Sequence, residues 1–232
     1  NMSNFEGDIA SWRRYANSLR LRIAMRVSKV NPTLARTQGE LSLNSPAGLL
    51  ESADMVINTG FAHPIVTISN SWGDIRMGAE MESILTGFGD GRIETYFTPS
   101  ADPALAGEYK GIRMGVDIES KGQYLDHAAI GDVIGGETLT WMTAAEVLFL
   151  KAEAALRGWS GAGSAQANYE AGVTASFAQH GVAGVADYLA DSTSTPADFV
   201  DALNTVNDVA YASDVKIAYN PAGTNEEQLE QI

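Results

Sequence analysis

The chain has 232 residues, with 15 lysines and arginines against 29 aspartates and glutamates, and it has no cysteine. That length can bury a substantial core, while the absence of cysteine excludes disulfides, thiolate metal sites and a cysteine nucleophile. The net charge of −14 argues against binding to nucleic acid or to an anionic membrane surface, because both need clustered cations. No apolar run approaches the roughly 20 residues that cross a bilayer.

The charges are unevenly spread along the chain. Seven of the 15 basic residues lie between Arg13 and Arg36, whereas the part after Gly158 has one base, Lys216, and ten acids. Apolar residues separate these acids at helical intervals. The pattern therefore favours a solvated helical surface over an acidic binding tail.

Neither end of the sequence carries a boundary signal. The chain opens with NMSNFEGDIASW, which has no apolar leader, and closes with NEEQLEQI, which has no helix stop signal. We expect an internal piece of a longer protein. The missing targeting signals then say little about the location of the parent.

The first predicted helix runs from about Asp8 to Val30 and carries six basic residues. We expect its apolar stripe to face the core and its arginines to pair with surplus acids, rather than to meet a membrane or nucleic acid. The stripe recurs at steps of three and four residues and consists of Ile9, Trp12, Ala16, Leu19, Ile23, Val27 and Val30.

One Asn-Pro pair and one Ser-Pro pair follow the first helix. Asn31 and Pro32 predict an N-cap with proline at the first helical position, opening a helix that ends near Leu43. Ser45 and Pro46 repeat the signal and predict a second, shorter helical segment.

Residues 58–140 have a different texture, because glycine is dense there and helical periodicity is broken. We expect ordered loops, one short helix over about 76–86 and a small strand pair. Aromatic residues argue against disorder, and a loop region of this length in a compact domain is usually functional.

Helical periodicity returns at Thr143. Thr143 and Glu146 form a capping-box pattern, Met142 and Val147 lie where a hydrophobic staple would place them, and Gly158 ends the helix. The next helix presents three residues at steps of four and ends at Gly181; they are Tyr169, Val173 and Phe177. The alanine-rich pair resembles a tetratricopeptide unit.

A further helix is predicted after Thr195, where Pro196 and Asp198 complete a second capping-box pattern. This helix would present an apolar stripe made of Phe199, Leu203, Val206 and Ala210.

Patterns for catalysis and metal binding are missing from the sequence. The three histidines, His63, His127 and His180, are far apart and none lies in a zinc-hydrolase motif. Residues 158–162 nearly spell a nucleophile elbow but lack its final glycine, and the S-x-x-K match at 213–216 is a pattern common by chance. We therefore expect no enzyme, no metal site and no cofactor.

Three segments together resemble one family, the SusD/RagB-like outer-membrane nutrient-binding lipoproteins of Bacteroidetes. They are WRRYANSLRLRIAMRVSKVNPTLA at residues 12–35, SWGDIRMGAEMESILTGFGDGRIETYFTP followed by GEYKGIRMG within 71–115, and MTAAEVLFLKAEAALRGW followed by NYEAGVTASFAQHG within 142–181. Their order and spacing match the family across most of the chain. Gly91 departs from the pattern, where proline is expected.

The resemblance implies a mainly α-helical fold, with tetratricopeptide-like helix pairs forming an α-solenoid-type scaffold and a loop-rich region facing the ligand. Residues 1–232 would be one SusD-like domain inside a longer chain. The implied parent is a cell-surface lipoprotein of the outer membrane that binds a nutrient, usually an oligosaccharide, and works with a SusC-like TonB-dependent transporter. Its only membrane contact would be a lipid anchor outside this chain.

A sugar-binding site needs aromatic rings on well-held loops, because pyranose faces stack on them while polar groups bind the hydroxyls. We expect Trp12 and Trp141 to be core residues and leave Trp159 open between core and surface. The candidate ligand-binding residues lie in the loop-rich region and are Trp72, Arg76, Tyr96, Tyr109 and Tyr124.

Two other functions fit the same sequence. RagB-like members serve peptide uptake, so the cargo can be a peptide, and an acidic surface would favour a basic one. The chain can also be a helical-repeat scaffold that binds only protein, chiefly the transporter.

Overall fold

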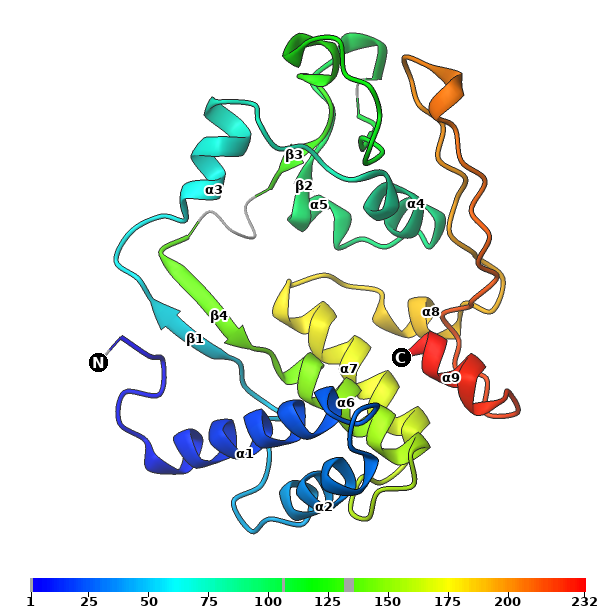
Figure 1. The fold of residues 1–232 in the computed structure, drawn as a ribbon. Helices are drawn as coiled ribbons and strands as arrows, with labels where there is room; N and C mark the ends of the chain where they lie inside the picture. The colour runs from blue at the N-terminus through cyan, green and yellow to red at the C-terminus, as the bar shows by residue number, and fades with distance from the viewer. Residues whose placement is uncertain (1, 106, 132–135) are drawn as a thin grey trace. The chain divides into compact units, whose positions relative to one another are not determined.

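The structure, a computed structural model, describes residues 2–105, 107–131 and 136–232 and divides into two compact units (Figure 1). Unit 1 consists of Asn1–Thr59, Leu139–Gly181 and Ala218–Ile232, and unit 2 of Gly60–Thr138 and Val182–Ile217. Each unit is thus assembled from segments that are distant in the sequence.

Unit 1 is built from paired helices. Helix α1 packs along α2 and also contacts α6, while α6 packs along α7 and contacts α9 (Figure 1). The bounds are Ile9–Arg26 for α1, Pro32–Leu43 for α2, Ala144–Leu156 for α6, Ala165–Gln179 for α7 and Asn225–Gln231 for α9. The predicted mainly α fold with tetratricopeptide-like pairs is confirmed.

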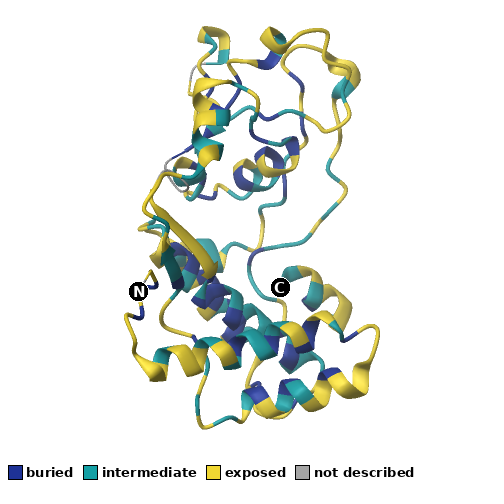
Figure 2. Cartoon of the chain, turned by 60° about the vertical axis from the view of Figure 1, so that its left-hand side comes forward, coloured by how far each residue is buried: buried dark blue, intermediate teal, exposed yellow. Residues whose placement is uncertain are grey.

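A two-stranded ribbon and two apolar clusters complete unit 1. Strand β1, Met55–Asn58, pairs with β4, Thr138–Met142. One cluster joins α1, α2 and α6 around Leu21 and Trp159, and the other joins the ribbon to α6 through Met142 and Val147. Figure 2 shows the buried residues on the helix faces that meet each other.

Capping side chains begin helices of unit 1, and two of these caps, Asn31 and Thr143, are predicted by the sequence. Asp8 accepts from the Ala10 N–H at 3.0 Å, Asn31 from the Leu34 N–H at 3.1 Å, and the Thr143 hydroxyl from the Glu146 N–H at 3.0 Å. The second half of the predicted capping box at Thr143 is replaced by another contact: the Glu146 carboxylate accepts from Arg22 Nε at 2.5 Å. A predicted arginine–acid pair thus forms here.

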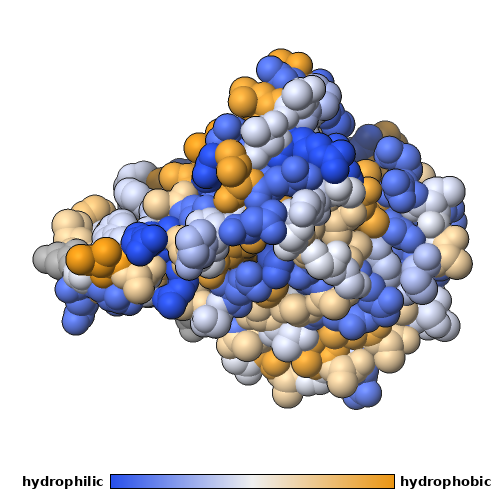
Figure 3. All heavy atoms as spheres, turned by 90° about the horizontal axis from the view of Figure 1, so that it is seen from below, coloured by the Kyte–Doolittle hydropathy of each residue, from blue (hydrophilic) through white to orange (hydrophobic). Residues whose placement is uncertain are grey.

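The predicted apolar stripe of α1 is mostly wrong: Leu19 and Val27 pack, partly buried, against the core clusters, and the other five members are exposed. The buried side chains are Leu21, Ala24, Met25 and the small Ser18, whereas Ile23 is 56% exposed. Leu21 and Ile23 are two positions apart, about 200° around the helix, so the core contacts the opposite face. Ser18 and Ala24 let α2 and α6 approach closely. On the face seen in Figure 3, hydrophobic residues lie in small groups among hydrophilic ones.

Unit 2 has short elements joined by long connections, as the glycine-rich sequence predicts. Its strands β2 and β3 form an antiparallel pair, with Phe97 opposite Ile130. The elements are α3 (Pro64–Val66), a π-helical turn (Thr67–Ser71), α4 (Ala79–Gly87), α5 (Ile93–Tyr96), β2 (Phe97–Thr98), β3 (Ala129–Ile130), α8 (Val185–Ala190) and 3₁₀ turns at Pro103–Leu105, Lys121–Tyr124 and Thr205–Asn207.

Buried carboxylates hold these connections together. Glu82 accepts from Lys110 Nζ at 2.5 Å and from the Gly111 N–H at 2.6 Å. Asp90 pairs with Arg92 and also accepts from the Tyr188 hydroxyl at 3.0 Å. These contacts explain how irregular segments stay ordered, because a buried charge must be paired and hydrogen-bonded.

Two predicted helices do not form. The segment after Thr195 forms no α-helix: Phe199 is bridged to Val209, and a 3₁₀ turn lies between them at Thr205–Asn207. Phe199 is the one buried member of its predicted stripe. Asp201 competes with helix formation because its carboxylate accepts from the N–H of Leu203 at 2.8 Å. The short helix predicted at Ser45 and Pro46 is also missing. The Ser45 hydroxyl accepts from the Ala47 N–H at 3.2 Å, and the chain forms a turn there.

Candidate functional site

Unit 2 contains a pocket of about 470 Å³, lined by both polar and apolar side chains, that includes an exposed tryptophan. Three segments supply its lining: 70–76, 98–101 and 121–129. Trp72 is one of the lining residues, and it is 58% exposed, so its indole is available to a ligand. Asn70, Lys121 and Asp126 line the same pocket and offer hydrogen-bonding groups of both kinds.

Local hydrogen bonds hold Trp72 in this position. The π-helical turn that follows α3 ends when the Trp72 N–H donates to the Thr67 carbonyl at 3.0 Å. Gly73 then turns the chain with φ of 73°, a left-handed conformation that glycine adopts without strain. The Gly73 N–H donates to the Ser69 carbonyl at 3.1 Å. An aromatic ring on a tightly closed turn is thereby presented to solvent.

Arg76 lies beneath this turn and bonds to backbone carbonyls. Its Nε donates to Leu125 O at 2.7 Å, and its Nη1 donates to Ser69 O at 2.8 Å and to Ile75 O at 2.7 Å. Burial lowers the pKa of Arg76, while the nearby Asp126 and Asp74 oppose that shift. The guanidinium carries its positive charge, as arginine side chains in proteins effectively always do.

His127 closes the inner side of the pocket. Its side chain is 5% exposed and packs edge-on against Tyr124, with ring centroids 5.0 Å apart. Burial lowers its pKa; Asp201 and Asp102 oppose the shift, whereas Lys110 and Arg76 reinforce it. The neutral imidazole is therefore favoured near pH 7.

The five predicted ligand residues lie in different surroundings. Trp72 and Arg76 line the pocket together. Tyr96 and Tyr109 pack against the core cluster around Met77, and Tyr124 is 3% exposed, with its hydroxyl donating to Asp201 Oδ2 at 2.9 Å. The ligand roles of all five residues stay predictions.

Sequence reasoning did not select Lys121, Asp126 or His127 as site residues. No motif marks them, because they reach the pocket only through the packing of the 121–129 segment against the turn at Trp72. The expectation that Trp141 is a core residue is wrong, since it is 50% exposed on β4. Trp159, left open, is buried.

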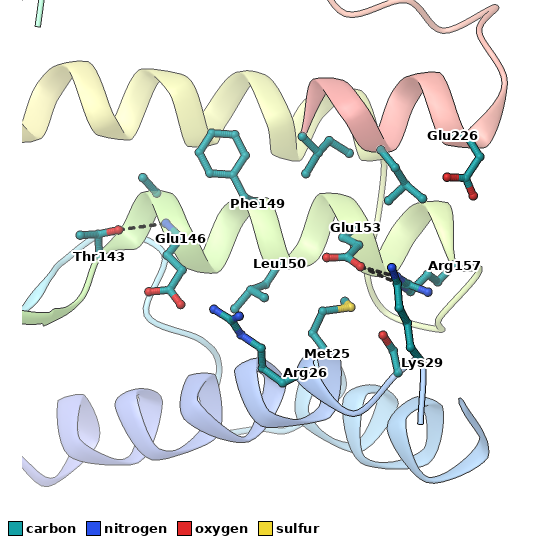
Figure 4. Close-up of a pocket in the computed structure, with 14 residues that line it drawn as sticks. Met25, Arg26, Lys29, Thr143, Glu146, Phe149, Leu150, Glu153, Arg157 and Glu226 are labelled. Carbon is teal, nitrogen blue, oxygen red and sulfur yellow. Dashed lines mark hydrogen bonds and ion pairs between the residues drawn. The ribbon is translucent and has the colours of Figure 1, made fainter. Parts of the chain in front are cut away.

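Unit 1 has a larger pocket, of about 840 Å³, between α1, α6 and α9 (Figure 4). Arg26 lies across from Glu146, and Glu153 is paired with Arg157 along α6. Among the described residues that line this pocket, Phe149 is the one aromatic side chain. The pocket thus lacks the exposed ring that distinguishes the site at Trp72.

Within residues 2–105, 107–131 and 136–232 there is no group of three metal-ligating side chains. Over the same ranges, no helix combines the length and the apolar character needed to cross a bilayer.

The family model of SusD and RagB outer-membrane lipoproteins, SusD-like, matches residues 3–232. The chain therefore belongs to the SusD-like family. A search of curated proteins found no match.

Several solved SusD-like structures share the fold. A chitin-binding SusD homologue from Flavobacterium johnsoniae is 44% identical, with a TM-score of 0.96 over 100% of this chain and 48% of its own. A SusD-like protein from Bacteroides thetaiotaomicron is 34% identical, with a TM-score of 0.92 over 100% and 49%. A homologue from Bacteroides vulgatus is 35% identical, with a TM-score of 0.88 over 96% and 46%. The chain spans about half the length of these relatives.

Proposed function

We propose that the protein is a non-enzymatic, glycan-binding subunit of a nutrient importer, and that the Trp72 pocket is its sugar platform. The observation that carries this proposal is the exposed indole in a pocket that also holds hydrogen-bonding side chains. A pyranose ring can stack its apolar face on Trp72, while Asn70, Lys121 and Asp126 bind its hydroxyls. The likeness to a chitin-binding homologue favours chito-oligosaccharides as ligands.

The family description supports the cellular setting of this proposal. SusD-like proteins are outer-membrane lipoproteins, so we place the parent protein at the cell surface, held by a lipid anchor. There it would receive the glycan and pass it to a SusC-like TonB-dependent transporter. Since a binding subunit only hands over its cargo, it needs neither a catalytic group nor a cofactor.

Calorimetry on the full-length protein tests the platform. Titration with hexa-N-acetylchitohexaose should show binding, and Trp72→Ala should weaken it by about tenfold or more, the scale of losing a hot-spot aromatic. Trp141→Ala is a matched control, because Trp141 is also half exposed but lies on β4. If Trp72→Ala binds the sugar as tightly as the wild type, the assignment is wrong.

A further inference from the structure

We propose that Arg76 is a positioning residue for the sugar platform: it fixes the turn that presents Trp72 and does not bind the ligand itself. The proposal rests on the proposed function only in calling Trp72 a sugar platform. It assigns to Arg76 a role different from direct ligand binding.

The hydrogen bonds of Arg76 join the two walls of the pocket. Ser69 and Ile75 belong to the segment that contains Trp72, whereas Leu125 directly precedes Asp126 and His127 on the other wall. One guanidinium thus ties together carbonyls of two segments that lie about fifty positions apart in the sequence. Bonds from a charged donor are roughly twice as strong as neutral ones.

The contact with Ser69 acts directly on the turn at Trp72. The Ser69 carbonyl accepts both from Arg76 Nη1 and from the Gly73 N–H, the residue after Trp72. The Ser69 side chain is fully buried, and its hydroxyl accepts from the Ile130 N–H at 3.1 Å, which ties the turn to β3. Arg76 therefore holds the turn at the point that sets the direction of the indole.

The two walls also lie close together at Gly73. A Cβ atom there would lie 2.4 Å from Leu125 Cδ1, so the end of the Leu125 side chain would have to move to admit it. The Lys121–Asp74 ion pair between the same walls is exposed and so contributes little. Hydrogen bonds from Met77 to Ala128 and from Ile130 to Ser69 also join these walls, and Arg76 adds three bonds to backbone carbonyls from a single side chain.

Two substitutions separate positioning from charge. Arg76→Lys keeps the positive charge, but a single ammonium on a shorter reach cannot join three carbonyls, and Arg76→Met removes every donor. We expect both variants to lose about tenfold or more in affinity for hexa-N-acetylchitohexaose. Arg113→Met is the matched control, because Arg113 is a guanidinium of unit 2 outside the pocket, and it should bind as the wild type does.

A spectroscopic readout reports positioning without any ligand. In ¹⁵N–¹H spectra of the free protein, the Trp72 indole resonance should shift or broaden in Arg76→Lys, while the Trp141 resonance stays in place. In the Trp72→Ala background, Arg76→Met should cause no further loss of affinity, because it acts through Trp72.

Several results would overturn the proposal. These are full affinity in Arg76→Lys, additive losses in the double variant, or an unchanged Trp72 resonance. If the Arg76 variants do not fold, Gly73→Ala perturbs the same junction and should move the Trp72 resonance; an unmoved resonance would then count against the proposal. Gly115→Ala is its control, with φ of 84° and no neighbour within 4 Å. Failure of the proposed function is a separate result: it would appear as unchanged sugar binding in Trp72→Ala.

Discussion

His127 links the protonation of one residue to the stability of unit 2. Burial lowers its pKa below the ordinary value of about 6.5, so the unfolded chain takes up the proton first as the pH falls. The stability that this residue contributes is therefore complete above about pH 6.5 and is lost as the pH drops through that value. The pKa values of Asp90 and Asp201 are lowered, so these acids titrate at more acidic pH.

We predict that the free energy of unfolding decreases between pH 7.5 and pH 5.5, and that His127→Gln reduces this decrease. Urea denaturation across that pH range, followed by circular dichroism, measures it. An equal decrease in wild type and variant would show that His127 does not control stability in this window.

Gly39 is a second residue whose size matters. A Cβ atom there would lie 2.2 Å from Cζ3 of the buried Trp159 ring. Alanine is the better helix former, yet we predict that Gly39→Ala destabilises unit 1 by about 1–3 kcal/mol, the usual cost of overpacking.

The test of this packing is a double-mutant cycle with Trp159→Leu, measured by urea denaturation. The smaller side chain should make room for the new methyl group, so the two losses should not add. Strict additivity, or a stabilising Gly39→Ala, would contradict the close contact.

At the scale of elements, short-range signals in the sequence predicted helix starts well. Asn31 and Thr143 cap helices as expected, because an N-cap depends on atoms two or three residues away. The face of α1 and the segment after Thr195 were predicted wrongly. Both depend on distant partners: small residues of α1 that admit neighbouring helices, and Asp201, which is bound by Tyr124.

The cap at Thr143 has a measurable weight. Thr143→Ala removes the acceptor of the Glu146 N–H and should destabilise unit 1 by about 1 kcal/mol, whereas Thr143→Ser keeps the hydroxyl and should cost little. Urea denaturation of the wild type and the two variants measures these free energies of unfolding. An equal loss of stability in both variants would show that the Thr143 hydroxyl does not stabilise the helix.

At the scale of the whole molecule, the three sequence segments identified the family, and the family model confirms it over residues 3–232. The two-unit assembly could not be predicted, because each unit draws on segments from distant parts of the chain. The pocket at Trp72 was half predictable: an aromatic residue on a glycine-rich loop suggested Trp72, but only packing brings Asp126 and His127 beside it. The single-domain organisation of residues 1–232 stays a prediction.

In the proposed function, a sugar ring stacks on the indole of Trp72. Each of the four tryptophans of this chain gives an indole N–H resonance, which a single Trp→Phe substitution in the full-length protein can assign. When hexa-N-acetylchitohexaose is added to the ¹⁵N-labelled full-length protein, the Trp72 resonance should shift progressively to saturation, while those of Trp12, Trp141 and Trp159 should stay in place. A sugar that leaves the Trp72 resonance unmoved, or that moves the resonance of Trp141 in its place, would contradict the account.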